Sequence, residues 1–236
     1  MTSGRPGQAR RGPVRAVLLD ALGTLVELEP PAPRLRGELK RRFGLSVAEA
    51  TAQRAIAAEI AYYRQHLDEG RDPASLTELR ERCADVVAGE LARSGAQSVP
   101  EPARLTEALL ASLRFRRFPD VLASLTELRR RGLRTLVVSN WDISLHSVLE
   151  RLGVSQLLGG VLTSAEVGVR KPASEIFARA LAVLNVSPEQ AWHIGDSLDE
   201  DVAGARAAGI TPVLIRRGGP DPAQAAAVSD VAQISS

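Results

Sequence analysis

The sequence predicts an α/β fold, a Rossmann-like doubly wound parallel sheet with an inserted all-helical domain, and three observations carry this prediction. Short apolar runs typical of strands buried on both faces alternate with helical patterns near both ends of the chain. Between them, residues 32–116 show helical patterns and no strand pattern. Several apolar runs end directly in a polar or acidic residue, as expected where parallel strands meet the ligand-binding edge of an open sheet.

The length of 236 residues suits a core domain with an insertion. We expect residues 14–28 and 119–236 to form the α/β core and residues 29–118 to form the helical insertion. Residues 1–13 are rich in Gly, Pro and Arg and are expected to be a disordered arm.

Charge is unevenly distributed. The first 15 residues hold four arginines and no acid, so the net charge of +2 becomes −2 for residues 16–236. The basic balance therefore belongs to the arm, and we expect no nucleic-acid partner for the folded body. No apolar run approaches the ~18 residues needed to span a bilayer, and a single cysteine, Cys83, excludes an intramolecular disulfide framework. A cytoplasmic protein without membrane association is expected.

The first predicted strand lies in the segment VRAVLLDALGTL, residues 14–25. Val17 to Leu19 form a continuous apolar run, and Asp20 ends it. Gly23 allows a tight turn, and Thr24 brings a hydroxyl and a backbone N–H close to the carboxylate. Asp20 is therefore placed where the chemistry of an open α/β sheet is expected.

The helical block follows a cluster of prolines at positions 30, 31 and 33. Two candidate capping boxes, beginning at Ser46 and Ser75, predict helix starts at those serines. The expected helices cover about 34–43, 46–66, 75–94 and 102–114.

Strands and helices alternate after residue 118, which implies right-handed βαβ units and a parallel sheet. Strands are expected at 133–138, 160–163, 191–194 and 211–215. Helices are expected at 121–131, 143–152, 174–184 and 202–208.

The candidate chemistry lies just beyond these strands. Asp20, Ser139 and Asp196 each end a predicted strand, Lys171 lies in a loop, and Asp201 follows in GDSLDED. Lys171 is one of only two lysines in a chain with 28 arginines, so a compact ammonium group at this position is worth attention. A carboxylate nucleophile, a hydroxyl, an ammonium and further acids at one edge would suit phosphoryl transfer with Mg²⁺.

The motifs DALGTL, VVSN, GVRKP and HIGDSLDED occur in the order found in the haloacid dehalogenase-like hydrolase superfamily, which this chain resembles over nearly all of residues 14–215. It looks most like the dehalogenase-like branch with a helical cap. The resemblance implies that Asp20 is the nucleophile, that Ser139 binds the transferring group and that Lys171 neutralises the nucleophile and the intermediate. The expected substrate-binding residues are Thr24, Asn140 and Trp141. The expected Mg²⁺ residues are Asp20, Leu22, Asp196 and Asp201.

Leu22 departs from the phosphatase pattern, which has an aspartate there as general acid and base. Haloacid dehalogenases also lack that aspartate, because halide leaves without a proton. Two other features favour a metal site: such dehalogenases carry Ser-Ser-Asn where this chain has Gly195-Asp196-Ser197, with Asp196 in the ligand position, and Phe177 stands where they have Tyr. We therefore expect Mg²⁺-dependent hydrolysis of a small anionic phosphate ester. A 2-haloacid dehalogenase and a non-catalytic binding protein remain alternatives.

Each of three further residues has two interpretations. Trp141 either lines the pocket or belongs to the core. Arg170 either selects an anionic substrate or is a surface charge. His193 lies inside a strand pattern, where packing is favoured over catalysis. The sequence leaves the substrate and the oligomeric state open.

Overall fold

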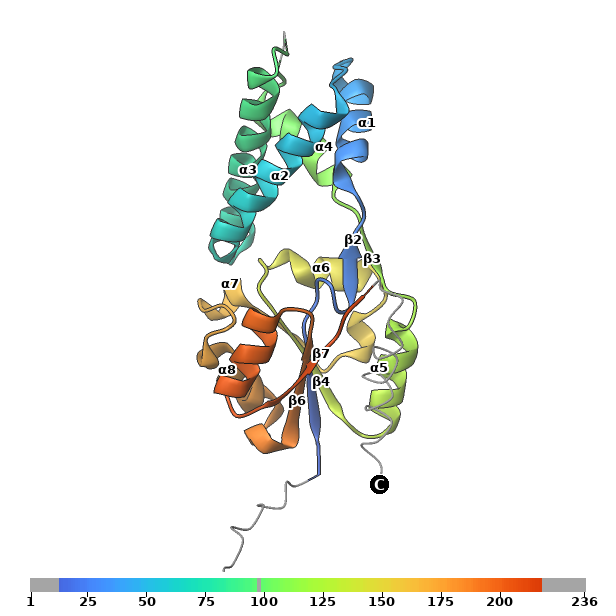
Figure 1. Ribbon diagram of the computed structural model, residues 1–236, viewed down its shortest axis with the longest axis vertical. Coiled ribbons are helices and arrows are strands. Elements are labelled where there is room, and N and C mark those ends of the chain that lie inside the picture. Colours follow the sequence, from blue (N-terminus) through green and yellow to red (C-terminus); the bar gives the residue numbers. More distant parts are fainter. Residues whose placement is uncertain (1–12, 97–98, 218–236) are drawn as a thin grey trace, which may run out of the picture.

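The computed structural model describes residues 13–96 and 99–217. A parallel sheet with flanking helices forms one end of an elongated molecule, and a helical bundle forms the other (Figure 1). The predicted arm, apart from residue 13, lies outside the described residues, as do residues 218–236 of the predicted core.

The sheet has five parallel strands in the order β5-β4-β1-β6-β7. β1 lies at its centre, with Leu18 in register between Leu136 and His193. Every residue of β1 is buried, which is the property that its continuous apolar run predicts. The predicted α/β doubly wound fold is thus confirmed. The strand bounds are β1 Ala16–Leu19, β4 Arg134–Ser139, β5 Val161–Thr163, β6 Ala191–Gly195 and β7 Thr211–Leu214.

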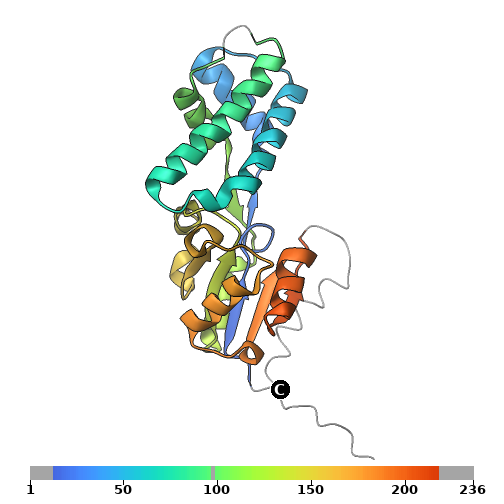
Figure 2. The ribbon, with the colours of Figure 1, turned by 90° about the vertical axis from the view of Figure 1, so that its left-hand side faces the viewer.

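Helices cover both faces of this sheet (Figure 2). Successive residues of β1 point to opposite faces, so Val17 and Leu19 join one apolar cluster while Ala16 and Leu18 join another. The first cluster includes residues of α5 (Val121–Arg130) and α6 (Ser144–Arg151). The second includes residues of α8 (Ser174–Leu184) and α9 (Gly204–Ala207). The two-sided core holds the carboxyl ends of the strands in fixed positions.

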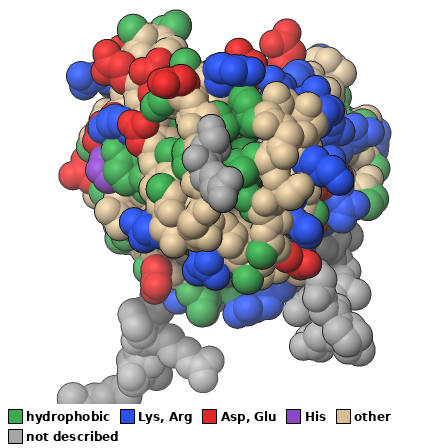
Figure 3. Space-filling model, turned by 90° about the horizontal axis from the view of Figure 1, so that it is seen from above, with side chains coloured by type: hydrophobic (Ala, Val, Ile, Leu, Met, Phe, Trp, Pro, Cys, Tyr) green, Lys and Arg blue, Asp and Glu red, His purple; other side chains and the backbone are tan. Residues whose placement is uncertain are grey.

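The bundle has its own apolar core, built from four helices. These are α1 (Pro31–Phe43), α2 (Glu49–His66), α3 (Pro73–Arg93) and α4 (Pro102–Ser112). Seen from the bundle end, basic and acidic side chains both lie on the surface, with hydrophobic side chains among them (Figure 3).

Both predicted capping boxes are wrong. α2 is preceded by Ala48, which makes no side-chain cap, so Ser46 lies outside the helix. α3 begins at Pro73, and the carboxylate of Asp72 accepts hydrogen bonds from the backbone N–H groups of Ala74 and Ser75. Proline suits the first helical position because it has no N–H that needs a partner there, and this moves the start upstream of the predicted serine.

A two-stranded antiparallel ribbon joins bundle and sheet (Figure 1). β2 (Val26–Leu28) leaves the core, and β3 (Phe115–Arg117) returns to it. The pairing extends to Glu29, whose N–H donates to the carbonyl of Arg114 at 2.9 Å. β3 begins inside the block predicted to be free of strands, so that prediction is wrong at its last residues. Three residues are too few for a strand pattern to stand out.

Within the described ranges, none of the helices combines the length and apolar composition that crossing a bilayer requires.

Candidate active site

Asp20 extends β1 by one residue. Its backbone N–H donates to the carbonyl of Ile194 at 2.9 Å, which continues the ladder with β6, and the residue is 6% exposed. Gly23 then turns the chain with a φ of 80°. A Cβ on Gly23 would lie 2.0 Å from Oδ2 of Asp196, so glycine also lets the two acidic segments approach each other.

Ser139 lies at the end of β4, beside β1. Its hydroxyl donates to Oδ1 of Asp20 at 3.0 Å. Asn140 follows, and both ends of its amide bind the main chain of Lys171: Oδ1 accepts from the N–H at 2.7 Å, and Nδ2 donates to the carbonyl at 2.9 Å. Asn140 therefore holds the loop of Lys171. Its predicted role in binding substrate stays a prediction.

Lys171 is the centre of the site. Its side chain is 1% exposed, and its ammonium nitrogen lies 2.6 Å from Oδ1 of Asp20 and 2.6 Å from Oδ1 of Asp201. Burial alone would lower the pKa of Lys171, but the two carboxylates outweigh it and raise that pKa. The lysine therefore stays charged between two acids.

Asp201 reaches the site from a π-helical segment, Leu198–Ala203 (η4). The N–H of Ser197 donates to its Oδ2 at 2.9 Å, and the ring nitrogen Nε2 of His193 lies 2.8 Å from its Oδ1. Burial opposes ionisation, yet hydrogen bonding from His193 and the charge of Lys171 hold the pKa of Asp201 below its ordinary value. A Cβ on Gly195 would lie 2.1 Å from Cγ of Asp201, so glycine at the end of β6 makes room for this carboxylate.

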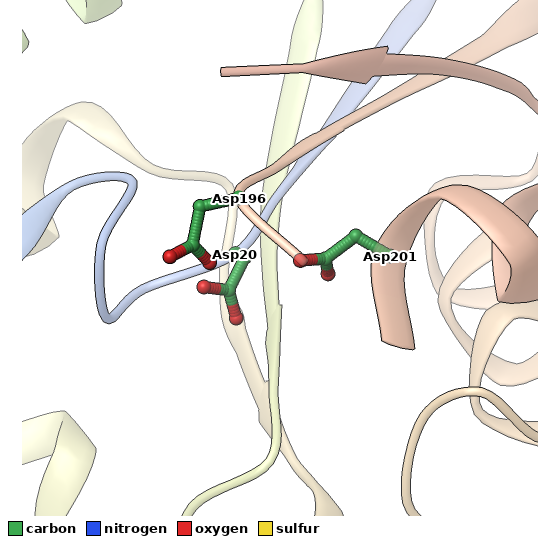
Figure 4. Close-up of side chains that lie close together, drawn as sticks. All are labelled: Asp20, Asp196 and Asp201. Atoms are coloured by element: carbon green, nitrogen blue, oxygen red, sulfur yellow. The ribbon is translucent and has the colours of Figure 1, made fainter. Parts of the chain in front are cut away.

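Three carboxylates gather at the edge of the sheet. Oxygen atoms of Asp20, Asp196 and Asp201 all lie within 4.8 Å of one another, and Figure 4 shows their side chains converging from three segments. Burial, with the negative charges of Asp20 and Asp201, raises the pKa of Asp196 to about 6. Anionic oxygen donors are the ligands that Mg²⁺ prefers, so the residues present fit this ion.

The other predicted site residues differ in their surroundings. Leu22 is 38% exposed and forms an isolated bridge with Val26; its side chain has no oxygen, so only its backbone carbonyl can serve as a metal ligand. Thr24 is 1% exposed, and its hydroxyl has no hydrogen-bond partner among the described residues. Trp141 is 6% exposed and packs against Phe115 of β3, with ring centroids 5.1 Å apart. This position favours the core interpretation of Trp141.

The bundle touches the site at contacts that sequence reasoning missed. The hydroxyl of Tyr63 in α2 donates to Oδ2 of Asp142 at 2.9 Å. Asp68, in the short helix η1 (Leu67–Glu69), accepts from Ser164 of α7 (Ser164–Val167) and from Nε of Arg170, the latter at 2.7 Å. These partners flank Asn140 and Lys171 in sequence.

Arg170 also reaches the backbone of α2: its Nη1 donates to the carbonyl of Arg64 at 2.8 Å. Arg170 is thus a partly exposed charge that joins the core to the bundle, and its selection of an anionic substrate stays a prediction. No local pattern signals these pairings, because the partners lie about a hundred residues apart.

Known proteins resemble this chain along most of its length. A family model described as haloacid dehalogenase-like hydrolase matches residues 14–209. The glyceraldehyde 3-phosphate phosphatase of Methanopyrus kandleri is 33% identical over 211 residues, which cover 87% of this chain and 85% of that protein. The haloacid dehalogenase-like hydrolase domain-containing protein 3 of Mus musculus is 30% identical over 211 residues, covering 88% of this chain and 84% of that protein.

Solved structures share the fold. A HAD phosphatase from Thermococcus onnurineus superposes with a TM-score of 0.57 at 25% identity, covering 88% of this chain and 89% of the other. The L-2-haloacid dehalogenase of Xanthobacter autotrophicus superposes with a TM-score of 0.61 at 20% identity, covering 93% and 83% of the two chains. The match to the family model spans most of the residues that form the sheet and the bundle, and the predicted resemblance is confirmed: the chain belongs to the haloacid dehalogenase-like hydrolase family and is a hydrolase.

Proposed function

We propose that the protein hydrolyses a small phosphate ester through a phosphoaspartyl intermediate on Asp20, with Mg²⁺ bound by Asp20, Asp196 and Asp201 and by the backbone carbonyl of Leu22. The observation that carries the proposal is the carboxylate of Asp196 beside those of Asp20 and Asp201. Lys171 neutralises one of these three acids, so without a further cation the two remaining negative charges would repel an anionic substrate. Relatives named as phosphatases support the same substrate class.

The chain's own residues divide the work. Ser139 and Lys171 both donate to Oδ1 of Asp20, so Oδ2 is the oxygen left to attack phosphorus. The bond to the ester oxygen breaks as the new P–O bond forms, and the leaving alkoxide takes a proton from water. Water then hydrolyses the aspartyl phosphate and releases inorganic phosphate. When bound, Mg²⁺ would supply positive charge for the phosphoryl oxygens.

The helical bundle and the cellular location belong to the same proposal. We propose that the bundle, residues 29–118, acts as a cap on the core formed by residues 14–28 and 119–236. Its contacts through Tyr63 and Asp68 support this, because they meet the loops beside the site. We also propose a cytoplasmic location, for which the single cysteine is the support.

The 2-haloacid dehalogenase remains a second candidate because of Leu22. A halide leaves without a proton, so a site without a general acid suits carbon–halogen cleavage as well. A non-catalytic role is disfavoured by the buried trio of Asp20, Lys171 and Asp201. Buried ion pairs contribute little net stability, so folding alone gives no reason to keep all three.

A substrate panel tests the proposal. The full-length protein is assayed with glyceraldehyde 3-phosphate, phosphoserine, an activated aryl phosphate and 2-haloacids, each with Mg²⁺ and with a chelator. We expect phosphate release that requires Mg²⁺ and is abolished in Asp20→Asn. Halide release that survives chelation, with no phosphate release, would overturn the proposal in favour of the dehalogenase.

A further inference from the structure

His193 lies in β6, between β1 and β7, and is fully buried. Its ring nitrogen Nε2 lies 2.8 Å from Oδ1 of Asp201. A carboxylate oxygen only accepts hydrogen bonds, so Nε2 carries the proton of this contact. His193 therefore touches the site through a single polar bond.

The rest of the ring is held by packing. Nδ1 is buried and has no hydrogen-bond partner within the described ranges. The ring meets Phe177 of α8 edge to face, with centroids 5.0 Å apart and planes at 83°. An unpartnered buried nitrogen destabilises the fold, so an apolar side chain would serve packing better here. The contact with Asp201 is what distinguishes histidine from such a side chain.

That contact meets the atom that positions the lysine. Oδ1 of Asp201 accepts from both His193 and Lys171, while Oδ2 accepts from the N–H of Ser197. His193 thus holds Oδ1 and Ser197 holds Oδ2, so both oxygens of the carboxylate are fixed by groups other than the lysine. Without His193, Ser197 would still hold Oδ2, but Oδ1 would be held only by the ammonium of Lys171, the group that it positions. Lys171 would then lose a fixed partner opposite Asp20.

We propose that His193 is a positioning residue, which acts through Asp201 to hold the ammonium of Lys171 against Asp20. Among the described residues, the hydrogen bond of His193 is with Asp201 and not with Asp20. This inference rests on the proposed hydrolase chemistry with Asp20 as nucleophile. It applies to a phosphate ester and to a 2-haloacid alike, because Lys171 contacts Asp20 in either reaction.

Three variants test it. His193→Leu removes the hydrogen bond, His193→Gln retains an amide donor at a similar reach, and Phe177→Leu disturbs the same ring packing without touching Asp201. We expect His193→Leu to lower kcat by about 10- to 100-fold, the effect of losing one hydrogen bond to a charged group. KM should stay within about threefold, because the lost order concerns the reacting groups rather than substrate binding.

The controls separate positioning from stability. His193→Gln should recover most of kcat, whereas Phe177→Leu should lower the melting temperature and leave kcat within about threefold of the parent. Equal losses of kcat in His193→Leu and Phe177→Leu, or no recovery with Gln, would overturn the inference.

A measurement without substrate completes the test. The chain has three histidines, so ¹⁵N-histidine spectra are simple, and the His193 signals are those that vanish in His193→Gln. We expect a proton on Nε2 that shifts in Asp201→Asn, and a bare Nε2 would overturn the inference. A parent that releases halide but no phosphate refutes the proposed function alone, and a parent inactive on both substrate classes refutes both proposals.

Discussion

The ammonium nitrogen of Lys171 lies 2.6 Å from Oδ1 of Asp20, although 151 positions separate the two residues in the chain. The same nitrogen lies 2.6 Å from Oδ1 of Asp201, and all three side chains are almost fully buried. One positive charge thus serves two acids where little water can screen them. The stability and the chemistry of the site depend together on this one lysine.

Replacing Lys171 with Met should therefore harm both properties. The variant leaves two unpaired buried carboxylates, so we expect a loss of about 3–5 kcal/mol in the free energy of unfolding. kcat should fall by at least about 10²-fold, because the variant lacks the positive charge that we propose stabilises the transition state. Urea unfolding and steady-state kinetics measure the two effects.

The other lysine supplies the control. Lys40 is exposed on α1, and Lys40→Met should change neither quantity. Adding Asp201→Asn to Lys171→Met should restore part of the stability and none of the activity. A Lys171→Met protein with full activity would rule out the assigned site.

Leu22→Asp should convert the site into one with an acid and base beside the nucleophile. Leu22 is 38% exposed, so a carboxylate there stays partly hydrated and folding should survive. For an ester with a poor leaving group, we expect the rate to rise by a factor within about 10² to 10⁴. The rise should be smaller for an activated aryl phosphate. Parallel assays of both esters with Mg²⁺ measure this difference.

Val183→Asp is the matched control, because it adds the same charge at an exposed position on α8. It should leave both rates unchanged. If Leu22→Asp folds normally and gains on neither ester, general acid catalysis is not what the native enzyme lacks.

The buried acid of the bundle should make stability depend on pH. Burial raises the pKa of Glu59 from 4.5 to about 7, although a hydrogen bond from Cys83 opposes the shift. Between these values the folded state binds more protons at Glu59 than the unfolded state, so this residue's contribution to stability falls as pH rises from 4.5 to 7. The total change is roughly 3 kcal/mol, at 1.36 kcal/mol per pKa unit.

Glu59→Gln removes the ionisable carboxyl group, and with it the pH-dependent contribution of this residue to the free energy of unfolding. The variant should match the parent near pH 5 within about 1 kcal/mol and exceed it near pH 8 by up to roughly 3 kcal/mol in urea unfolding. Glu81→Gln, which removes the same kind of charge at an exposed position of α3, is the matched control. A Glu59→Gln protein less stable than the parent at pH 8 would contradict the expectation.

Asp68 should control the fraction of molecules in which the bundle is docked on the core. Its carboxylate binds Ser164 and Arg170, so Asp68→Ala removes both contacts at once. Losing about 1–3 kcal/mol of hydrogen bonding should shift the docked population by about 5- to 150-fold. We expect faster hydrogen exchange at residues 63–70 and a higher KM.

Glu69→Ala is a close control, since Glu69 is the next residue and its ion pair with Arg82 lies within the bundle. It should leave exchange in residues 63–70 and KM unchanged. Equal effects of the two substitutions would mean that the contacts of Asp68 with the core do not hold the bundle in its docked position.

Local patterns identified residues that the fold brings together at one edge of the sheet. The apolar run before Asp20 and the Gly-Asp pair at 195–196 identify strands that end in acids, and parallel strands bring their carboxyl ends to one edge. The rarity of lysine singled out Lys171. These features depend on neighbouring residues, and this is why the sequence was sufficient.

Other features depend on partners distant in the chain. Asn140 is a polar residue after a strand, and nothing local shows that its amide binds the backbone of Lys171. His193 was predicted to be packed; its strand pattern gives no sign of the carboxylate of Asp201 beside Nε2. The early start of α3 resulted from competition between two adjacent capping signals, which propensities alone do not resolve.

The ribbon of β2 and β3 has a consequence for how this protein can diversify. Both connections of the bundle run through adjacent, hydrogen-bonded strands, so the insertion enters and leaves the core at one point. We therefore expect that another helical module, or a short hairpin, could replace residues 31–112 without altering the order of any strand in the five-stranded sheet. The strand ends that carry Asp20, Ser139 and Asp196 would keep their places in such an exchange, because none of these residues lies in the exchanged segment.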